Sequence, residues 1–162
     1  MGSDAVAENT LWQDSFLARF SPPVQQKLLA LSEPFHFPAG QTIFEEGAAS
    51  LYLYVVKSGR VAIEAHIPAW GNRLITTLGP GELFSWSALI EPRIETASAR
   101  AVEDTEVVGI KGGALMDACR EDAEFGFQLY RTLAEVITDR LVSTRRQLLG
   151  GHHEPEEARI SR

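Results

Sequence analysis

Short segments with alternating apolar and polar residues follow one another between Pro34 and Lys111, and glycine separates most of them. A period of two is typical of β-strands, and glycine permits the tight corners between them. About eight such segments recur, roughly ten residues apart. This spacing indicates an antiparallel sandwich or jelly-roll-like β-roll. The predicted strands are PFHFPAG, QTIFEEG, LYLYVVKSG, GRVAIEAH, NRLITTLGPG, ELFS, IETASARA and TEVVGIK.

Helical periodicity flanks this region on both sides. Apolar residues recur every three or four positions over residues 11–31, and Ser21, which precedes two prolines, divides this stretch into two short helices. After Gly112 the pattern returns to helix, with a long amphipathic helix over residues 122–149. A short helix is also expected near Trp86. We therefore predict an α+β fold in which a β-roll lies between two short helices and one long helix.

Composition restricts the class of protein. Hydrophobic residues make up 44% of the chain, enough for an ordinary core. The net charge of -7 argues against a nucleic-acid surface over the whole molecule. The single cysteine, Cys119, cannot form an internal disulfide, and no apolar run approaches the roughly 18 residues of a membrane span. We expect a cytoplasmic protein without membrane contact.

The two ends of the chain are polar. Residues 1–10 and 150–162 are expected to be flexible, which leaves residues 11–149 as one domain. Adjacent histidines at 152 and 153 lack the fixed geometry of a metal site. The sequence suggests no Ser–His–acid grouping, phosphate-binding P-loop or paired-carboxylate cleft. We expect no metal site, no certain cofactor and no enzymatic activity.

The order of these elements, together with four motifs, resembles the cyclic nucleotide-binding domain found in the sensor half of Crp/Fnr-type bacterial regulators. The motifs are FPAGQTIFEEG, LYLYVVKSGRVAI, LGPGELF and TASARAVEDTEVVGIK, which cover about Pro34 to Lys111. The glycine corners at Gly40, Gly47, Gly59 and Gly81 strengthen the likeness. The resemblance implies a sensor that binds cAMP or cGMP and dimerises through its long helix.

The resemblance also places a phosphate-binding cassette between Gly81 and Ala97. In the family pattern, a glycine lets the backbone approach the cyclic phosphate, a glutamate accepts from the ribose, and an arginine neutralises the phosphate. This sequence has Ser85, Trp86 and Glu95 at those three positions. The candidate ligand-binding residues are Gly81, Leu83, Phe84, Ser85, Trp86, Ser87, Ala88, Arg93, Glu95, Thr96 and Ala97.

These departures alter the chemistry expected of the cassette. A buried Glu95 would repel a phosphate, and the indole nitrogen of Trp86 only donates hydrogen bonds. Arg93, two residues before Glu95 on a predicted strand, should point to the same side, and either it reaches an anion while Glu95 orients it or the two form a surface ion pair. Either Ser85 or Ser87 caps the short helix while Trp86 fills the pocket, or these residues hold a small anion.

The long helix supplies the remaining candidates. By resemblance it forms the dimer seam, for which the apolar stripe offers Leu129, Leu133, Val136, Ile137 and Leu141. Ser143 and Thr144 either reach a ligand from this helix or are exposed polar positions. The basic residues Arg140, Arg145 and Arg146 suit the C-terminal end of a helix dipole.

Three functions remain open at this point. The leading one is a ligand-sensing module with weak, altered or lost binding of cAMP or cGMP. The second is a Crp/Fnr-family transcription regulator truncated before its DNA-binding domain. The third is a ligand-free interaction module that uses the long helix. Relatives that read DNA carry a helix-turn-helix after this helix, and residues 150–162 do not resemble one, so we expect no direct nucleic-acid contact.

Overall fold

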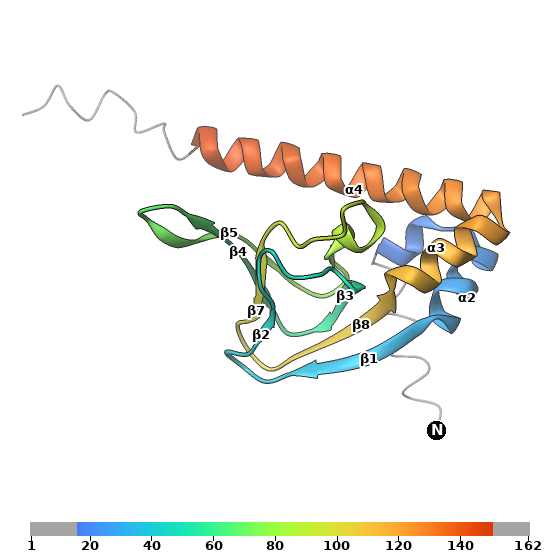
Figure 1. Ribbon diagram of the computed structural model, residues 1–162, viewed down its shortest axis with the longest axis horizontal. Coiled ribbons are helices and arrows are strands. Elements are labelled where there is room, and N and C mark those ends of the chain that lie inside the picture. Colours follow the sequence, from blue (N-terminus) through green and yellow to red (C-terminus); the bar gives the residue numbers. More distant parts are fainter. Residues whose placement is uncertain (1–15, 151–162) are drawn as a thin grey trace, which may run out of the picture.

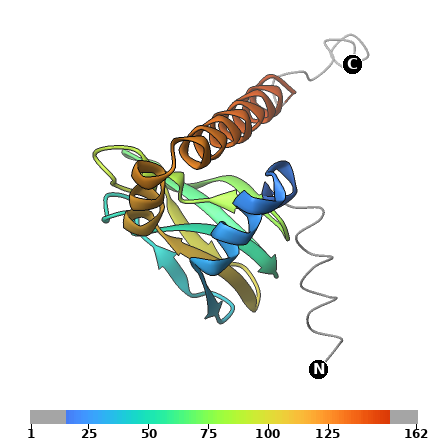
Figure 2. The same cartoon turned by 90° about the vertical axis from the view of Figure 1, so that its right-hand side faces the viewer.

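Eight strands form two four-stranded antiparallel sheets that together make a roll in the computed structural model, which describes residues 16–150. Helices cover one side of this roll, and the longest, α4 (Ala123–Gly150), extends along the whole molecule (Figure 1). In the view turned by 90°, α4 leans away from the roll toward its C-terminal end (Figure 2). The first half of α4 is therefore placed against the domain and the second half projects from it.

The two sheets each contain four strands, and neither follows the order of the sequence. The first sheet has the order β1–β8–β3–β6, formed by β1 (Ser32–Phe37), β8 (Thr105–Lys111), β3 (Tyr52–Ser58) and β6 (Leu83–Phe84). The second has the order β2–β7–β4–β5, formed by β2 (Thr42–Phe44), β7 (Ser98–Ala101), β4 (Val61–Ile67) and β5 (Gly71–Leu78). The corner between β3 and β4 requires Gly59, since its φ is 91° and a Cβ would lie 2.5 Å from the Asp104 carbonyl oxygen.

Four further helices complete the fold. They are η1 (Phe16–Arg19), α2 (Pro22–Ala30), η2 (Trp86–Leu89) and α3 (Gly112–Glu121). As predicted, Ser21 is the N-cap residue of α2 and proline follows it. The start of α3 approaches η2 closely, because a Cβ on Gly112 would lie 2.5 Å from the Ala88 carbonyl oxygen. This contact ties the helical layer to the loop between β6 and β7.

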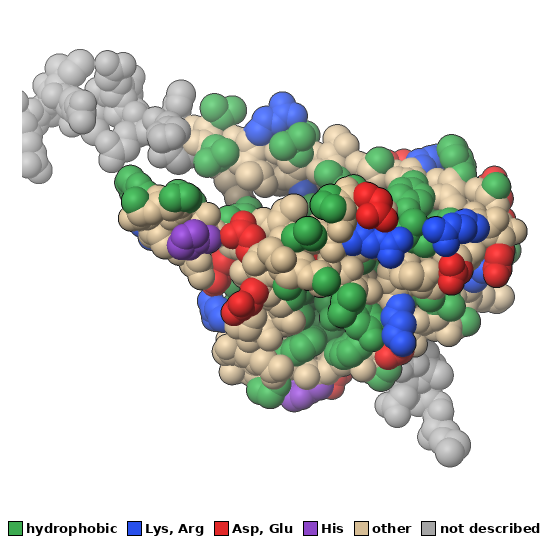
Figure 3. Space-filling view, in the orientation of Figure 1, with side chains coloured by type: hydrophobic (Ala, Val, Ile, Leu, Met, Phe, Trp, Pro, Cys, Tyr) green, Lys and Arg blue, Asp and Glu red, His purple; other side chains and the backbone are tan. Residues whose placement is uncertain are grey.

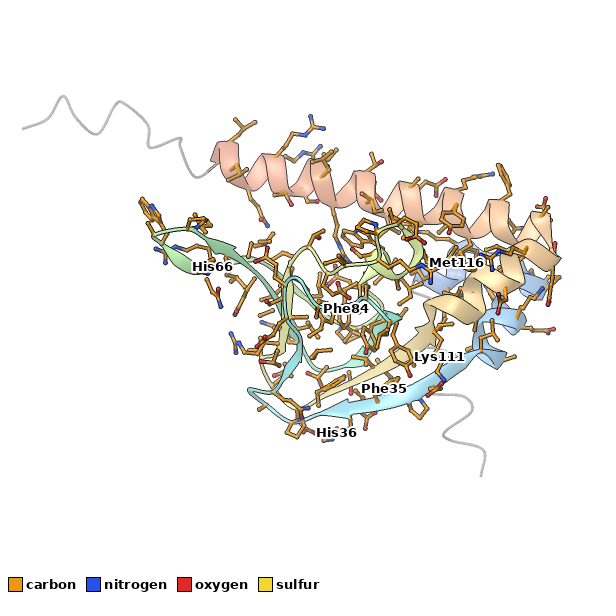
Figure 4. The ribbon with its side chains drawn as sticks, viewed as in Figure 1. Phe35, His36, His66, Phe84, Lys111 and Met116 are labelled. Atoms are coloured by element: carbon orange, nitrogen blue, oxygen red, sulfur yellow. The ribbon has the colours of Figure 1, made fainter. Side chains whose placement is uncertain are left out.

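Strand β3 divides two hydrophobic cores. Its side chains alternate, so that Leu53 and Val55 face the helices while Tyr54 and Val56 face the interior of the roll. The helical core also contains buried residues of η1, α2, α3 and α4. The roll core is aromatic, with Phe84 in its interior (Figure 4) and stacked on Tyr54 at 5.1 Å between ring centroids. Burial on both faces explains why β3 is a continuous apolar run.

The structure confirms the predicted fold class, including the short helix near Trp86 and the long C-terminal helix. Two boundaries differ from prediction. The strand predicted to begin at Ile94 begins only at Ser98, because Ile94 makes a single isolated bridge with Ala49. Gly150 still belongs to α4. The start of the first predicted helix, residues 1–10, which were predicted to be flexible, and the rest of the predicted tail lie outside the described residues.

Candidate functional site

The predicted cassette lies between β6 and β7, beneath α4 (Figure 1). Strand β6 pairs with β3 through Phe84 and Tyr54, which holds the start of the cassette on the roll. Gly81 has a positive φ of 85° in the turn that leads into β6, and its N–H donates to the Val56 carbonyl oxygen at 2.8 Å. Leu83, Phe84, Ser87 and Ala88 are all buried. The structure therefore brings most of the predicted cassette residues into one compact element.

Ser85 stands where the family pattern has glycine, and its backbone conformation is one that favours glycine. Its φ of 64° and ψ of 38° are left-handed, a region that glycine enters without cost and other residues rarely adopt. Ser85 is the N-cap residue of η2, but its hydroxyl makes no capping hydrogen bond. This corrects the predicted Ser85 cap, because the hydroxyl instead donates to the Glu95 carboxylate.

Glu95 is buried, with only 5% of its surface exposed. Its Oε1 accepts hydrogen bonds from the hydroxyls of Ser85 and Ser50, the latter at 2.6 Å. Its backbone is also fixed, since its N–H donates to the Ala48 carbonyl oxygen and its carbonyl oxygen accepts from the Gly47 N–H, both at 2.8 Å. Burial raises the pKa of Glu95, and the two hydroxyls oppose this effect by stabilising the carboxylate. The carboxyl group is thus held by side chains of its own chain.

The phenol of Tyr54 lies in the roll core near this carboxyl group. Burial, followed by the neighbouring Tyr52 and Glu95, raises the pKa of Tyr54 to about 12. Tyr54 therefore stays neutral at physiological pH and supplies no charge to the site.

Arg93 does not join Glu95, which corrects the prediction that the two side chains point the same way. The backbone at Arg93 is left-handed, with φ at 55°, and lies outside the regular strand, so the period of two does not apply. The Arg93 Nε lies 3.2 Å from Glu91 Oε1, and its guanidinium also contacts the Met116 sulfur of α3. Arg93 therefore lies beside Glu91 and not, as one predicted alternative had it, in an ion pair with Glu95. The remaining candidates Thr96 and Ala97 are exposed and half-buried, respectively.

Trp86 is half-buried against the helical core, and a charged residue of α4 covers it. The Cζ of Arg140 lies 5.0 Å from the Trp86 ring centroid, and the Arg140 guanidinium donates to the Leu83 carbonyl oxygen. Burial lowers the pKa of Arg140, an effect that the nearby Glu82 carboxylate opposes. Sequence reasoning placed Arg140 only in a basic cluster. The sole signal for this role was an arginine on the apolar side of α4.

The predicted dimer residues divide into two groups. Leu129 and Leu133 are 0% and 2% exposed and pack in the core of their own chain, while Val136 and Ile137 are partly buried against that core. Leu141 is 53% exposed. This corrects the placement of Leu129 and Leu133 at a seam, because the first half of the apolar stripe attaches α4 to the roll. A partner would have to contact a different stripe.

One cavity lies between α4 and the start of the cassette. It has a volume of about 310 Å³ and is lined by Phe16, Arg19, Pro80, Gly81, Glu82, Leu83, Val136, Asp139, Arg140 and Ser143. The predicted Ser143 thus faces this cavity, while Thr144 is half-buried.

Within residues 16–150, no three His, Cys, Asp or Glu side chains form a group suited to a metal ion. In the same range, no helix combines the length and apolar character of a membrane span.

Comparison with known proteins identifies the family. The model of the cyclic nucleotide-binding domain matches residues 34–122, more than half of the chain. The chain belongs to the cyclic nucleotide-binding domain family. Its relatives and structural neighbours place it with the Crp/Fnr type.

Two curated regulators illustrate the relationship. A CRP-like cAMP-activated global transcriptional regulator of Mycobacterium tuberculosis is 32% identical over 102 residues, 63% of this chain and 46% of the regulator. The cyclic AMP receptor protein of Thermus thermophilus is 39% identical over 74 residues, 46% of this chain and 34% of the receptor. The chain therefore spans less than half the length of either regulator.

Solved structures agree with this assignment. The catabolite activator protein of Thermus thermophilus superposes with a TM-score of 0.68 and 28% identity, over 85% of this chain and 61% of that one. Fold and family are thus established for a domain that makes up only part of such regulators.

Proposed function

We propose that this chain is a non-enzymatic regulatory module of the Crp/Fnr type whose cassette has lost the usual recognition of cAMP and cGMP. The observation that carries this proposal is Glu95. A buried carboxylate, already bound by Ser50 and Ser85, stands where the family pattern has the arginine that neutralises the cyclic phosphate. Trp86 stands where the pattern has the glutamate that accepts from the ribose.

The physical reason is the sign of the charge. Two like unit charges about 4 Å apart repel each other by roughly 4 kcal/mol at an effective dielectric constant near 20. A cyclic phosphate placed next to an ionised Glu95 would meet this repulsion, where a phosphate beside an arginine would be attracted. Protonation of Glu95 would remove the repulsion but would supply no positive charge. The cassette therefore lacks the main source of affinity for a cyclic nucleotide.

The shape of the cassette supports a loss of chemistry rather than a loss of fold. Ser85 has a left-handed backbone, which favours the glycine of the family pattern, and the short helix η2 follows it. Arg93 does not compensate, because its guanidinium contacts Glu91 and Met116 instead of approaching Glu95. Restoring the side chains should therefore restore binding.

Calorimetric titration tests this proposal. Protein that has been unfolded and refolded to strip carried-over ligand should give no heat with cAMP or cGMP up to millimolar concentration. The triple variant Ser85→Gly, Trp86→Glu, Glu95→Arg should bind with micromolar affinity, because it regains the phosphate and ribose contacts. Micromolar binding by the unmodified protein would contradict the proposal. If that binding also disappeared in Arg93→Ala, the displaced arginine would be the phosphate ligand.

We also infer that the module acts as a homodimer through a second stripe on α4. This stripe consists of the first and fourth positions of a seven-residue repeat, and most of these positions hold apolar or small residues. The stripe contains Phe127, Tyr130, Ala134, Ile137, Leu141, Thr144 and Leu148. It shares Ile137, which is partly buried against the helical core, with the stripe that attaches α4 to the roll. Phe127, Leu141 and Leu148 are exposed in the isolated chain, as a seam for a second helix requires. Figure 3 shows hydrophobic side chains along the projecting end of α4.

The wider role of the protein rests on its relatives. The Mycobacterium tuberculosis relative is a cAMP-activated transcriptional regulator, and a matching role for this chain as part of a longer regulator is the second candidate function. The matched segment is the sensor portion, so DNA binding is not part of the leading proposal. A cytoplasmic location and the lack of nucleic-acid contact stay predictions from composition.

A further inference from the structure

The contact between α4 and the cassette includes side chains that reach backbone acceptors at both ends of the segment formed by β6 and η2. At one end, the Arg140 guanidinium donates to the carbonyl oxygen of Leu83, in the strand that precedes η2. At the other end, the Tyr130 hydroxyl donates to the carbonyl oxygen of Leu89, the last residue of η2, at 3.0 Å. Tyr130 and Arg140 are separated by ten residues, about 15 Å along a helix. The two contacts therefore fix both the position and the tilt of α4 over the cassette.

Trp86 lies between these two anchor points, and Arg140 covers its ring. A guanidinium stacks well on an indole face because its planar charge is attracted by the ring electrons. Burying the charge would be costly without partners, and here the indole ring, the Leu83 carbonyl oxygen and the nearby Glu82 carboxylate provide them. By contrast, Arg145 and Arg146 on the same helix are exposed. Arg140 thus has a specific role that its neighbours do not share.

A cavity lies directly beside this contact. Arg140 lines it together with Val136, Asp139 and Ser143 of α4, and its volume is about 310 Å³. The Arg140 side chain therefore has free space on one flank into which it can rotate without displacing packed side chains. The contact with Trp86 can open without unfolding the helical core.

We propose that Arg140 and Trp86 form an intramolecular latch that holds α4 on the cassette without any bound ligand. Arg140 is a positioning residue, since it acts through the placement of α4. The latch gives the module a closed arrangement of its own, and removing it lets the projecting half of α4 move relative to the roll. This inference uses the proposed function only in taking α4 as the element that contacts a partner.

Hydrogen exchange followed by mass spectrometry tests the latch in the full chain without nucleotide. Arg140→Ala should increase exchange in α4 beyond residue 136 and in η2 by about fivefold or more, because a stacked charge and a hydrogen bond are lost. Arg145→Ala, which removes an exposed arginine five residues further along the helix, should leave both segments unchanged. The same comparison in a Leu141→Glu, Leu148→Glu background excludes protection by a second chain.

Arg140→Met separates the charge from the packing. Methionine keeps an unbranched stem over Trp86 but has neither the charge nor the hydrogen-bond donors. The latch predicts that this variant exchanges as fast as Arg140→Ala. Full protection in Arg140→Met, or unchanged exchange in Arg140→Ala, would overturn the proposal. Neither result depends on whether the cassette binds a nucleotide. Hydrogen exchange therefore tests the latch, and calorimetry tests the loss of nucleotide binding, independently of each other.

Discussion

The two halves of α4 serve different purposes although they form one continuous helix. In the first half, Phe125, Leu129 and Leu133 are fully buried and belong to the core that joins the helices to β3. In the second half, Leu141, Leu148 and Leu149 are 53%, 63% and 70% exposed. Arg140 lies at the boundary and turns back onto the cassette. The comparison teaches that apolar character along a helix does not reveal what it packs against, since the apolar side chains of one half are buried in the domain and those of the other are exposed.

The largest expected effect distinguishes the two halves by stability. Leu129→Ala should lower the free energy of unfolding by about 2–5 kcal/mol, because it leaves a cavity in a fully buried site. Leu149→Ala removes the same atoms from an exposed position and should change it by no more than about 0.5 kcal/mol. Urea unfolding followed by circular dichroism measures both. Equal effects would mean that the two halves are not distinct.

The second prediction concerns the partner surface. Leu141→Glu combined with Leu148→Glu should weaken self-association at least about tenfold, because it places like charges on both sides of a helix seam. Leu149→Glu is the matched control, since Leu149 is as exposed as Leu148 but lies one residue off the heptad stripe. Sedimentation velocity over a range of protein concentrations measures association. Equal dissociation by the control would remove the case for a specific seam.

The smallest expected effect concerns the cassette beneath the boundary between the halves. Burial raises the pKa of Glu95, so the folded protein binds this proton more tightly than the unfolded chain does. The contribution of Glu95 to stability therefore falls as the pH rises above its ordinary pKa. Glu95→Gln has no such titration, so its stability relative to the unmodified protein should increase from about pH 4 to pH 8.

Urea unfolding at several pH values between these limits measures the difference. A difference that does not change with pH would mean that folding leaves the acidity of Glu95 unaltered. Ser50→Ala provides a further check, because the loss of one hydroxyl donor should raise the pKa of Glu95 further and extend the pH dependence to higher pH.

Much of the fold could be predicted because its signals are local. The alternation within β3 and the serine and prolines at the start of α2 describe their own backbone, and the glycine corners do so as well. The position of the cassette followed from the same signals combined with the family resemblance. The predicted orientation of Arg93 was wrong, and the reason is also local. The left-handed backbone at Arg93 interrupts the strand on which the prediction depended.

By itself, the sequence determined the order of strands and helices, the location of the cassette and the absence of the usual glycine, glutamate and arginine from it. Only the tertiary structure decided what replaces them. Glu95 accepts a hydrogen bond from Ser50, which is 45 residues away in the sequence, and Arg140 donates one to Leu83, which is 57 residues away. The fold buries one stripe of α4 against the roll and leaves several residues of the other exposed. Local preferences act within a few residues, whereas partners for a buried charge and the choice of a buried helix face depend on which distant segments the fold brings together.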